Sequence, residues 1–186
     1  MSYAITVSAD FSELERLKKL LSHIPGAFSK AAKKAAGETI RAMKKTAGDE
    51  ASKVYETTGA KVRKHITLYP SSGTLMARGR RMNLSDYRMT PKRVRNPQHG
   101  IRGSVLRSTG MRFIPRGFLM RGANSGKVLA MMRTGKGRRD IKPLVSPAVP
   151  QMLENEEVSG VLEEEAGRIV LEKLKLYVNR AVTEGR

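Results

Sequence analysis

Two segments of the chain carry the hydrophobic periodicity of long amphipathic helices. The first follows Pro25 and extends towards Tyr55, with lysine and arginine on much of its remaining surface. The second follows Asn155, whose side chain is suited to cap a helix. Its apolar arc is wide, so we expect it to pack on more than one neighbour, such as its own sheet and an adjacent subunit. The apolar positions are Phe28, Ala32, Ala35, Ala36, Ile40, Met43 and Ala47 in the first helix, and Val158, Leu162, Ala166, Ile169, Val170, Leu174, Tyr177, Val178 and Ala181 in the second.

Shorter helices are predicted from capping and turn signals. Ser12 and Glu15 have the spacing of a capping box and begin a short helix. The segment Ala60–His65 is predicted to form one helical turn. A Ser-Pro pair begins another short helix over Ser146–Leu153.

Short β-branched or alternating runs predict strands. Phe118–Met120 and Val128–Met132 flank the small polar turn Gly122–Gly126, and together they predict a β-hairpin. The same pattern predicts three further strands, at Ala4–Ser8, Ile66–Tyr69 and Thr74–Ala77.

Residues 78–116 carry many arginines, and prolines and glycines interrupt their short apolar pieces. This composition predicts an extended basic loop region. The whole pattern indicates a single α+β domain over residues 1–186. In this domain the N-terminal and C-terminal helices pack on a small antiparallel β-sheet with long basic loops.

Composition narrows the possible chemistry. The chain has no cysteine, which excludes disulfides and thiolate metal sites. Its three histidines lie far apart without carboxylates or histidines at ligand spacing, so we expect no metal and no other cofactor. No apolar run approaches the roughly 20 residues that cross a bilayer, and the N-terminus lacks the pattern of a secretory signal. We therefore expect a soluble protein made in the cytoplasm, with no membrane partner.

Charge is distributed unevenly along the chain, whose formal net charge is +19. Residues 56–145 contain 21 basic and 3 acidic side chains, whereas residues 146–186 contain 5 basic and 8 acidic ones. A polyanion is one partner that fits so basic a segment. A charge-matched protein is the other, because the acidic C-terminal helix of one copy would meet the basic middle of the next in a head-to-tail ring.

Three arginine- and lysine-rich clusters are candidates to face DNA or an acidic partner. They lack interleaved aromatic side chains, which argues against base stacking, and the chain has no recognition-helix or zinc-finger pattern. Contact with nucleic acid would therefore be with the phosphate backbone and independent of sequence. The candidates are Arg78, Arg80, Arg81, Arg93, Arg95, Lys136, Arg138 and Arg139.

The sequence displays no arrangement typical of catalysis. Gly122–Lys127 resembles a phosphate-binding loop, but it has three residues between its glycines, lacks Ser or Thr after the lysine and lies between predicted strands. Glu163, Glu164 and Glu165 are consecutive on a helix and point in different directions. No G-x-S-x-G motif is present. We therefore predict that the protein is not an enzyme.

The order of motifs between Gly117 and Leu153 is distinctive. Phe118-Leu119-Met120 precedes the turn, Gly126-Lys127 and a strand follow it, and then come Arg138-Arg139 and the proline-punctuated run Ile141–Met152. In this order the chain resembles the minor tail protein Z family of tailed bacteriophages and prophages. The resemblance extends more loosely to the N-terminal and final helices. It implies an α+β structural virion protein that completes the tail at its head-proximal end.

The resemblance also implies an assembly. The subunit would belong to a sixfold ring, a hexamer, in the neck of a long-tailed phage that assembles in the host cytoplasm. The ring would be needed for tail maturation and head–tail joining. Its partners would be the tail terminator protein and the head connector proteins, with the genome end passing near or through the lumen. A sequence-independent nucleic-acid-binding protein, such as a ribosomal or chromatin-like component, is the alternative function.

The segment Val145–Met152 is predicted to dock on an adjacent subunit or ring, because its prolines fix an extended apolar edge. An aspartate at Val149 should then block assembly and leave the subunit folded. The interface candidates are Ile141, Pro143, Leu144, Val149, Pro150 and Met152.

Overall fold

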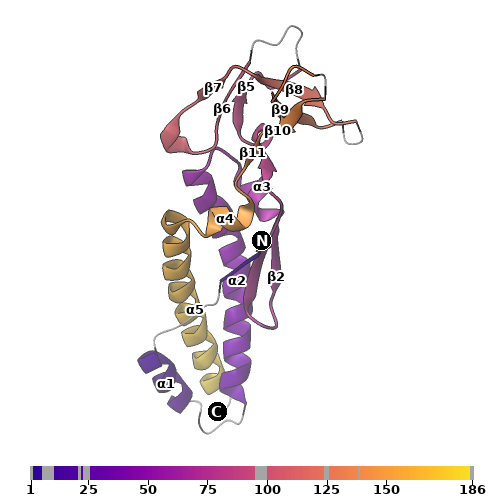
Figure 1. Cartoon of the computed structure of the whole chain (residues 1–186). Coiled ribbons are helices and arrows are strands. Elements are labelled where there is room, and N and C mark those ends of the chain that lie inside the picture. The colour runs from indigo at the N-terminus through magenta and orange to yellow at the C-terminus, as the bar shows by residue number, and fades with distance from the viewer. Residues whose placement is uncertain are drawn as a thin grey trace.

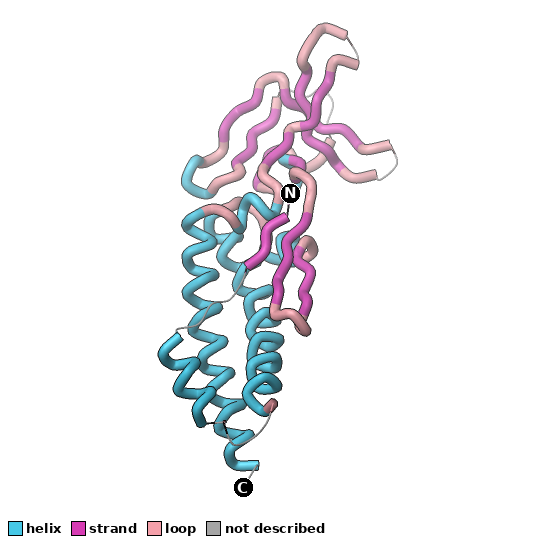
Figure 2. Tube along the Cα trace, turned by 60° about the horizontal axis from the view of Figure 1, so that its bottom comes forward, coloured by secondary structure: helices cyan, strands magenta, loops and turns pink. Residues whose placement is uncertain are grey.

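The molecule is elongated, with two long helices along much of its length and small sheets gathered at one end (Figure 1). Figure 2 shows the same separation after a turn of 60°, with one further sheet beside the helices. The α+β class predicted from the sequence is confirmed, although the strands form several small antiparallel sheets instead of one. The computed structural model describes residues 2–5, 11–20, 22, 26–94, 100–123, 126–137 and 139–184.

Helices α2 (Ala27–Val54) and α5 (Glu156–Glu184) are antiparallel and pack against each other. Both were predicted from periodicity, and both are confirmed. The N–H of Glu157 donates to the Asn155 side chain at 3.0 Å, so Asn155 caps α5 as expected. Small residues such as Ala35 and Ala47 are fully buried on α2, which lets neighbouring elements approach its backbone closely.

A polar contact joins the first half of α2 to the second half of α5. The Tyr177 hydroxyl donates to the Glu38 carboxylate, and the Lys173 ammonium lies 3.6 Å from the same carboxylate. The hydrogen bond from Tyr177, with the positive charge of Lys173, holds the pKa of Glu38 below its usual value. Helix α1 (Phe11–Leu20) packs on α5, and its buried Leu17 belongs to a second, smaller apolar cluster.

A three-stranded sheet lies beside α2. Its order is β1 (Ser2–Ile5), β3 (Thr74–Arg78) and β2 (Ile66–Tyr69), and both pairings are antiparallel. Ile66, Leu75 and Ala77 are buried in the main core. Strands β2 and β3 match their predictions; residues 6–8 of the first predicted strand lie outside the described residues.

The predicted hairpin is confirmed. Strand β8 (Gly117–Arg121) pairs with β9 (Val128–Arg133), and β10 (Ile141–Pro143) adds to the other side of β9. Leu119 and Ala130 occupy opposite positions in the register, and both are buried.

The sequence predicts an extended loop over residues 78–116. This prediction is wrong, because much of the region forms short strands. Each strand contributes at most two buried side chains, such as Met89 and Ile101, between exposed arginines, so the sequence shows no continuous apolar pattern. Gly103 admits Leu84, since a Cβ there would lie 2.9 Å from Leu84 Cδ2. The elements are β4 (Met82–Asn83), the 3₁₀ turn η1 (Leu84–Asp86), β5 (Arg88–Thr90), β6 (Ile101–Ser104), the 3₁₀ turn η2 (Arg107–Thr109) and β7 (Arg112–Ile114).

The segment after β10 returns to the core. Strand β11 (Val145–Ser146) pairs with β4, and helix α4 (Val149–Leu153) follows. The predicted short helix therefore exists, but it begins after Ala148. The buried Tyr87 hydroxyl donates to the Pro147 carbonyl at 3.1 Å, which ties the strand region to the entry of α4.

Candidate cationic binding groove

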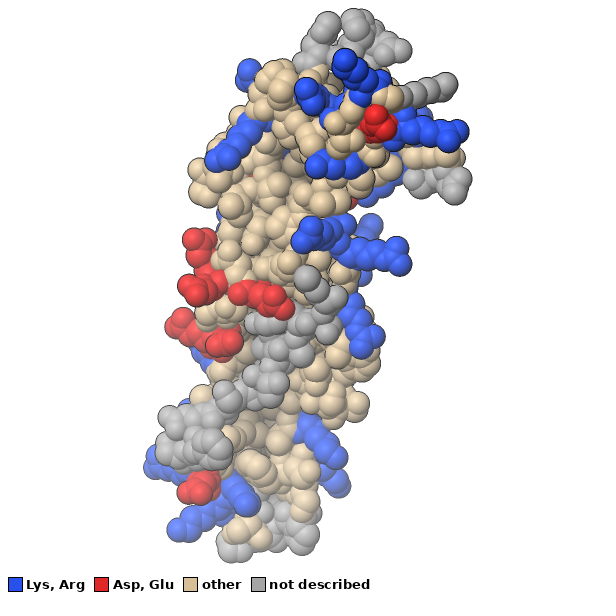
Figure 3. Space-filling model, viewed as in Figure 1, with Lys and Arg blue, Asp and Glu red and all other residues tan. Residues whose placement is uncertain are grey.

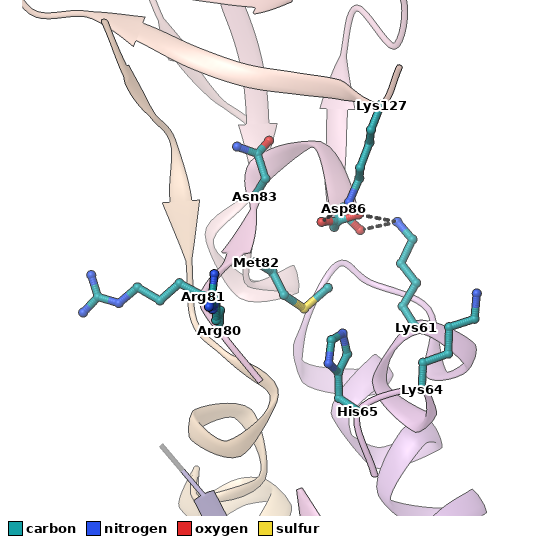
Figure 4. A pocket seen from close by; sticks show the side chains of 9 residues that line it. All are labelled: Lys61, Lys64, His65, Arg80, Arg81, Met82, Asn83, Asp86 and Lys127. Atoms are coloured by element: carbon teal, nitrogen blue, oxygen red, sulfur yellow. Dashed lines mark hydrogen bonds and ion pairs between the residues drawn. The ribbon is translucent and has the colours of Figure 1, made fainter. Parts of the chain in front are cut away.

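A hollow of about 600 Å³ opens where α3 (Gly59–Arg63) faces β4, η1 and the start of β9 (Figure 4). Among the described residues it is lined by five lysine or arginine side chains, one histidine and one carboxylate. We call it the cationic groove. Its lining residues are Lys61, Lys64, His65, Arg80, Arg81, Met82, Asn83, Asp86 and Lys127.

Helix α3 is fixed on α2 by close backbone contact. A Cβ at Gly48 would lie 2.9 Å from the Gly59 carbonyl oxygen, and one at Gly59 would lie 2.8 Å from the Gly48 carbonyl oxygen. The Arg63 guanidinium lies 2.9 Å from the Asp49 carboxylate, and Val62 is fully buried. Because these contacts hold the inner face of α3, Lys61 and Lys64 are left on its outer side, as Figure 4 shows.

Asp86 forms ion pairs with two lysines from distant parts of the chain. Its side chain is only 14% exposed, and one carboxylate oxygen lies 2.9 Å from the Lys127 ammonium and 3.7 Å from the Lys61 ammonium. Lys61 also donates to the Asp86 backbone carbonyl at 2.7 Å. The carboxylate therefore sets the positions of two cations without neutralising the groove.

Asn83 holds the wall of the groove against the hairpin. Its side-chain oxygen accepts from the Ser85 and Ala130 N–H groups at 3.0 and 2.8 Å, and its amide donates to the Ala130 carbonyl at 3.0 Å. These contacts satisfy the amide within the fold, so Asn83 acts as a structural tie.

Arg80 and Arg81 are the two predicted candidates that the structure brings into the groove. Both are exposed, and neither forms an ion pair with any described residue. Lys64 is also exposed and also lacks such an ion pair. Figure 4 shows the Arg81 side chain pointing away from Asp86.

The other predicted cations lie elsewhere. Arg78 ends β3 and Arg93 follows β5, and both are exposed. Lys136 and Arg139 lie in the exposed loop between β9 and β10, where the Asp140 carboxylate accepts from the Gly137 N–H at 2.9 Å. Arg95 and Arg138 lie outside the described residues.

Sequence reasoning missed Lys61, Lys64, His65 and Lys127. The spacing of Lys61 and Lys64 was a usable signal, because residues three apart share a helix face. Lys127 had no such signal, because long-range packing brings the hairpin to Asp86.

The predicted docking segment is only partly available to a partner. Pro143 is exposed, and Ile141 and Leu144 are half-buried, so these three remain interface candidates. Val149, Pro150 and Met152 are buried in the core of their own chain. The expectation that a charge at Val149 would leave the subunit folded is therefore wrong, because Val149 is 1% exposed at the start of α4.

The side of the molecule opposite the cationic groove is acidic. From Glu154 to Glu165 the chain has six glutamates and no lysine or arginine. Figure 3 shows red side chains along the outer side of the first half of α5, and blue side chains at the same level across the molecule. Glu157, Glu163 and Glu164 are exposed and form no ion pair with any described residue, whereas Glu165 pairs with Arg168 at 2.6 Å. We call this surface the acidic face.

The described part of the chain has neither a metal-ligand cluster nor a membrane-spanning helix. No group of three or more His, Asp or Glu side chains there is placed to hold a metal ion. No described helix is long and apolar enough to cross a membrane.

Comparison with known proteins found no significant match: no family model, no curated protein and no solved structure matches the chain.

Proposed function

We propose that this chain is a structural virion protein, a ring subunit of the tail-completion or neck region at the head-proximal end of a long-tailed phage tail. Its role would be to complete the tail so that the tail can join a filled head, without catalysis. The motif order between Gly117 and Leu153, which resembles the minor tail protein Z family, supports this assignment. Its partners would be further copies in a hexamer, the tail terminator protein and the head connector proteins.

One observation carries the proposal: opposite charges lie on opposite sides of an elongated subunit, at the same level along its length. A subunit with two different, complementary sides is suited to heterologous contacts, and heterologous contacts generate closed rings when the rotation closes. A polyanion-binding protein needs the basic surface, but it has no need of an exposed acidic side opposite to it. The exposed cations would also suit a lumen through which the genome end passes.

Particle composition tests the proposal. We expect the protein to co-purify with intact virions or tails, and imaging of those particles should show it as a ring between tail and head. Tails made without it should fail to join filled heads. Absence of the protein from particles, with normal head–tail joining, would contradict the proposal.

The alternative is a sequence-independent nucleic-acid-binding protein, and the cationic groove is the observation that favours it. Under this alternative the main property is binding of a monomer to duplex DNA, with affinity that falls steeply as salt rises. Sedimentation at moderate salt, with and without duplex DNA, separates the two functions. A discrete ring without DNA supports the structural role, and a monomer that binds any duplex supports the alternative.

A further inference from the structure

We infer that the occupant of the cationic groove is the acidic face of a second copy of the same chain. This inference rests on the proposed function, because it names the contact that would build the ring. It assigns one partner to each of the two charged surfaces.

Unpaired charge on both surfaces is the first support. Lys64, Arg80 and Arg81 form no ion pair with any described residue, although they line one hollow. On the other side, Glu157 and Glu164 likewise form no ion pair within the part of the chain that the structure describes. They are seven residues apart and therefore share one face of α5. Bringing these two sets together would pair charges that no contact within the described chain satisfies.

The position of the two surfaces is the second support. Helix α5 packs on one side of α2, and α3 packs on α2 as well, so α2 lies between the acidic face and the cationic groove (Figure 1). In Figure 1, α3, which borders the groove, lies near the level at which α5 begins, and Figure 3 shows blue side chains across the molecule from the red ones. Copies placed side by side with their long axes roughly parallel would therefore bring the acidic face of one against the groove of the next. In this arrangement an acidic face would contact a cationic groove, and two surfaces of the same charge would not meet.

The centre of the acidic face is the third support. Val161 lies between Glu157 and Glu164 and is 42% exposed, and a Cβ added at the neighbouring Gly160 would meet nothing within 4 Å. The groove has Met82 among its lining residues. The acidic face thus has an exposed apolar side chain surrounded by charge, which is the usual anatomy of a protein interface, whereas Met82 is only 7% exposed and forms the floor of the groove. Phosphodiester backbone would complement the groove but would leave Val161 uncovered.

Complementary charge reversal tests the contact. One variant carries Glu157→Lys and Glu164→Lys, and the other carries Lys64→Glu and Arg81→Glu. All four side chains are exposed, so circular dichroism should show both variants folded. Each variant alone has two surfaces of like charge at the proposed contact, and its self-association should be lost. A one-to-one mixture should assemble again as alternating copies, because each reversed surface then meets an opposite one.

A matched control uses charges outside the groove. Lys18→Glu with Lys19→Glu makes the same change in net charge at two exposed positions of α1, far from the groove, and should leave assembly unchanged. The measurement is sedimentation velocity at moderate salt. Anisotropy of a labelled DNA duplex is measured in parallel for the wild type, the groove variant and the control.

Each outcome decides the matter. Restoration of assembly only in the mixture supports the inference. If both variants assemble alone as the wild type does, the contact lies elsewhere and the inference is overturned, while the proposed function stands. If the groove variant keeps its assembly but binds duplex at least tenfold more weakly than the control does, the occupant is nucleic acid and the inference is overturned. If the wild type is monomeric in solution yet enters particles, this contact is wrong and the function holds; if it does neither, both fail.

Discussion

The paired long helices and the sheet-rich end of the molecule bury apolar surface in different ways. Helices α2 and α5 each bury an apolar stripe that repeats along the helix, so many small contacts contribute to their packing. In the region of β4 to β7, each strand supplies at most two buried side chains, and exposed arginines lie between them. The strands there are also held in place by a few side-chain hydrogen bonds, such as those of Asn83 and Tyr87. The helices thus form the scaffold, and the strands hold the charged surface on it.

The largest effect is expected at α4, where both regions share one core. Val149 is 1% exposed, and Val149→Asp would place an unpaired carboxylate among apolar side chains. We expect a loss of at least about 3 kcal/mol in the free energy of unfolding, enough to unfold a marginal domain. Thermal unfolding followed by circular dichroism measures this.

The matched control is Val145→Asp in the same segment. Val145 is 49% exposed, so its substitution should change the free energy of unfolding by no more than about 0.5 kcal/mol. Equal melting temperatures for the two variants would show that α4 does not join the helices to the strands. Val145→Asp is also the better probe of docking by this segment, because it leaves the fold intact.

The next largest effect is expected at the contact between α2 and α3. Gly48→Ala would force a methyl group to within 2.9 Å of the Gly59 carbonyl oxygen, and the backbone would have to move. We expect a loss of about 1–3 kcal/mol, measured by urea unfolding. On α5, Gly160→Ala meets open space and should instead add up to about 1 kcal/mol, because alanine is the better helix former. Two changes of the same sign and size would contradict the close contact.

A smaller effect is expected at Tyr87, which ties the strands to α4. Tyr87→Phe removes the hydroxyl that donates to the Pro147 carbonyl and should cost about 1 kcal/mol. Burial raises the pKa of Tyr87, so the hydroxyl stays protonated and remains a donor throughout the usual pH range. Tyr69→Phe, at an exposed tyrosine, is the control and should have almost no effect. Urea unfolding of both variants decides whether the tie is real.

The smallest effect is expected between the helices at Glu38. Its pKa is lowered in the folded protein, so the ionised carboxylate stabilises the fold above the usual glutamate pKa. This contribution is lost as the pH falls through the lowered value. Glu38→Gln should therefore melt slightly below the wild type at pH 7, and the difference should shrink near pH 3. A difference that is unchanged over this range would exclude a charged contact with Tyr177 and Lys173.

The long helices and the short strands also differ in how well the sequence predicts them. Helices α2 and α5 were predictable because their apolar residues repeat over many turns, and the β8–β9 hairpin was predictable because its turn is local. Strands such as β5 and β6 were not, because a single buried residue such as Met89 gives no period. Their pairing is set by tertiary contacts.

The groove was predictable only in part, for a similar reason. Arg80 and Arg81 stood out as a cluster in the sequence. Lys127 reaches Asp86 only after the hairpin packs, and no local pattern encodes that contact. The burial of Val149 escaped prediction because prolines favour extended backbone, whereas this segment pairs β11 with β4 and then turns inward.

The antiparallel packing of α2 and α5 also determines when the helical core can form during translation. Residues 55–155 separate the two helices in the chain, so a ribosome releases α2 and every strand before it makes α5. During that interval the apolar stripe of α2 lacks the partner that covers it, and such a chain is prone to aggregate or to occupy chaperones. A nonsense mutation ahead of residue 156 should therefore yield an insoluble fragment and not a smaller working subunit. The glutamates of α5 are made at the same late stage, so a chain acquires its acidic face only as its helical core closes.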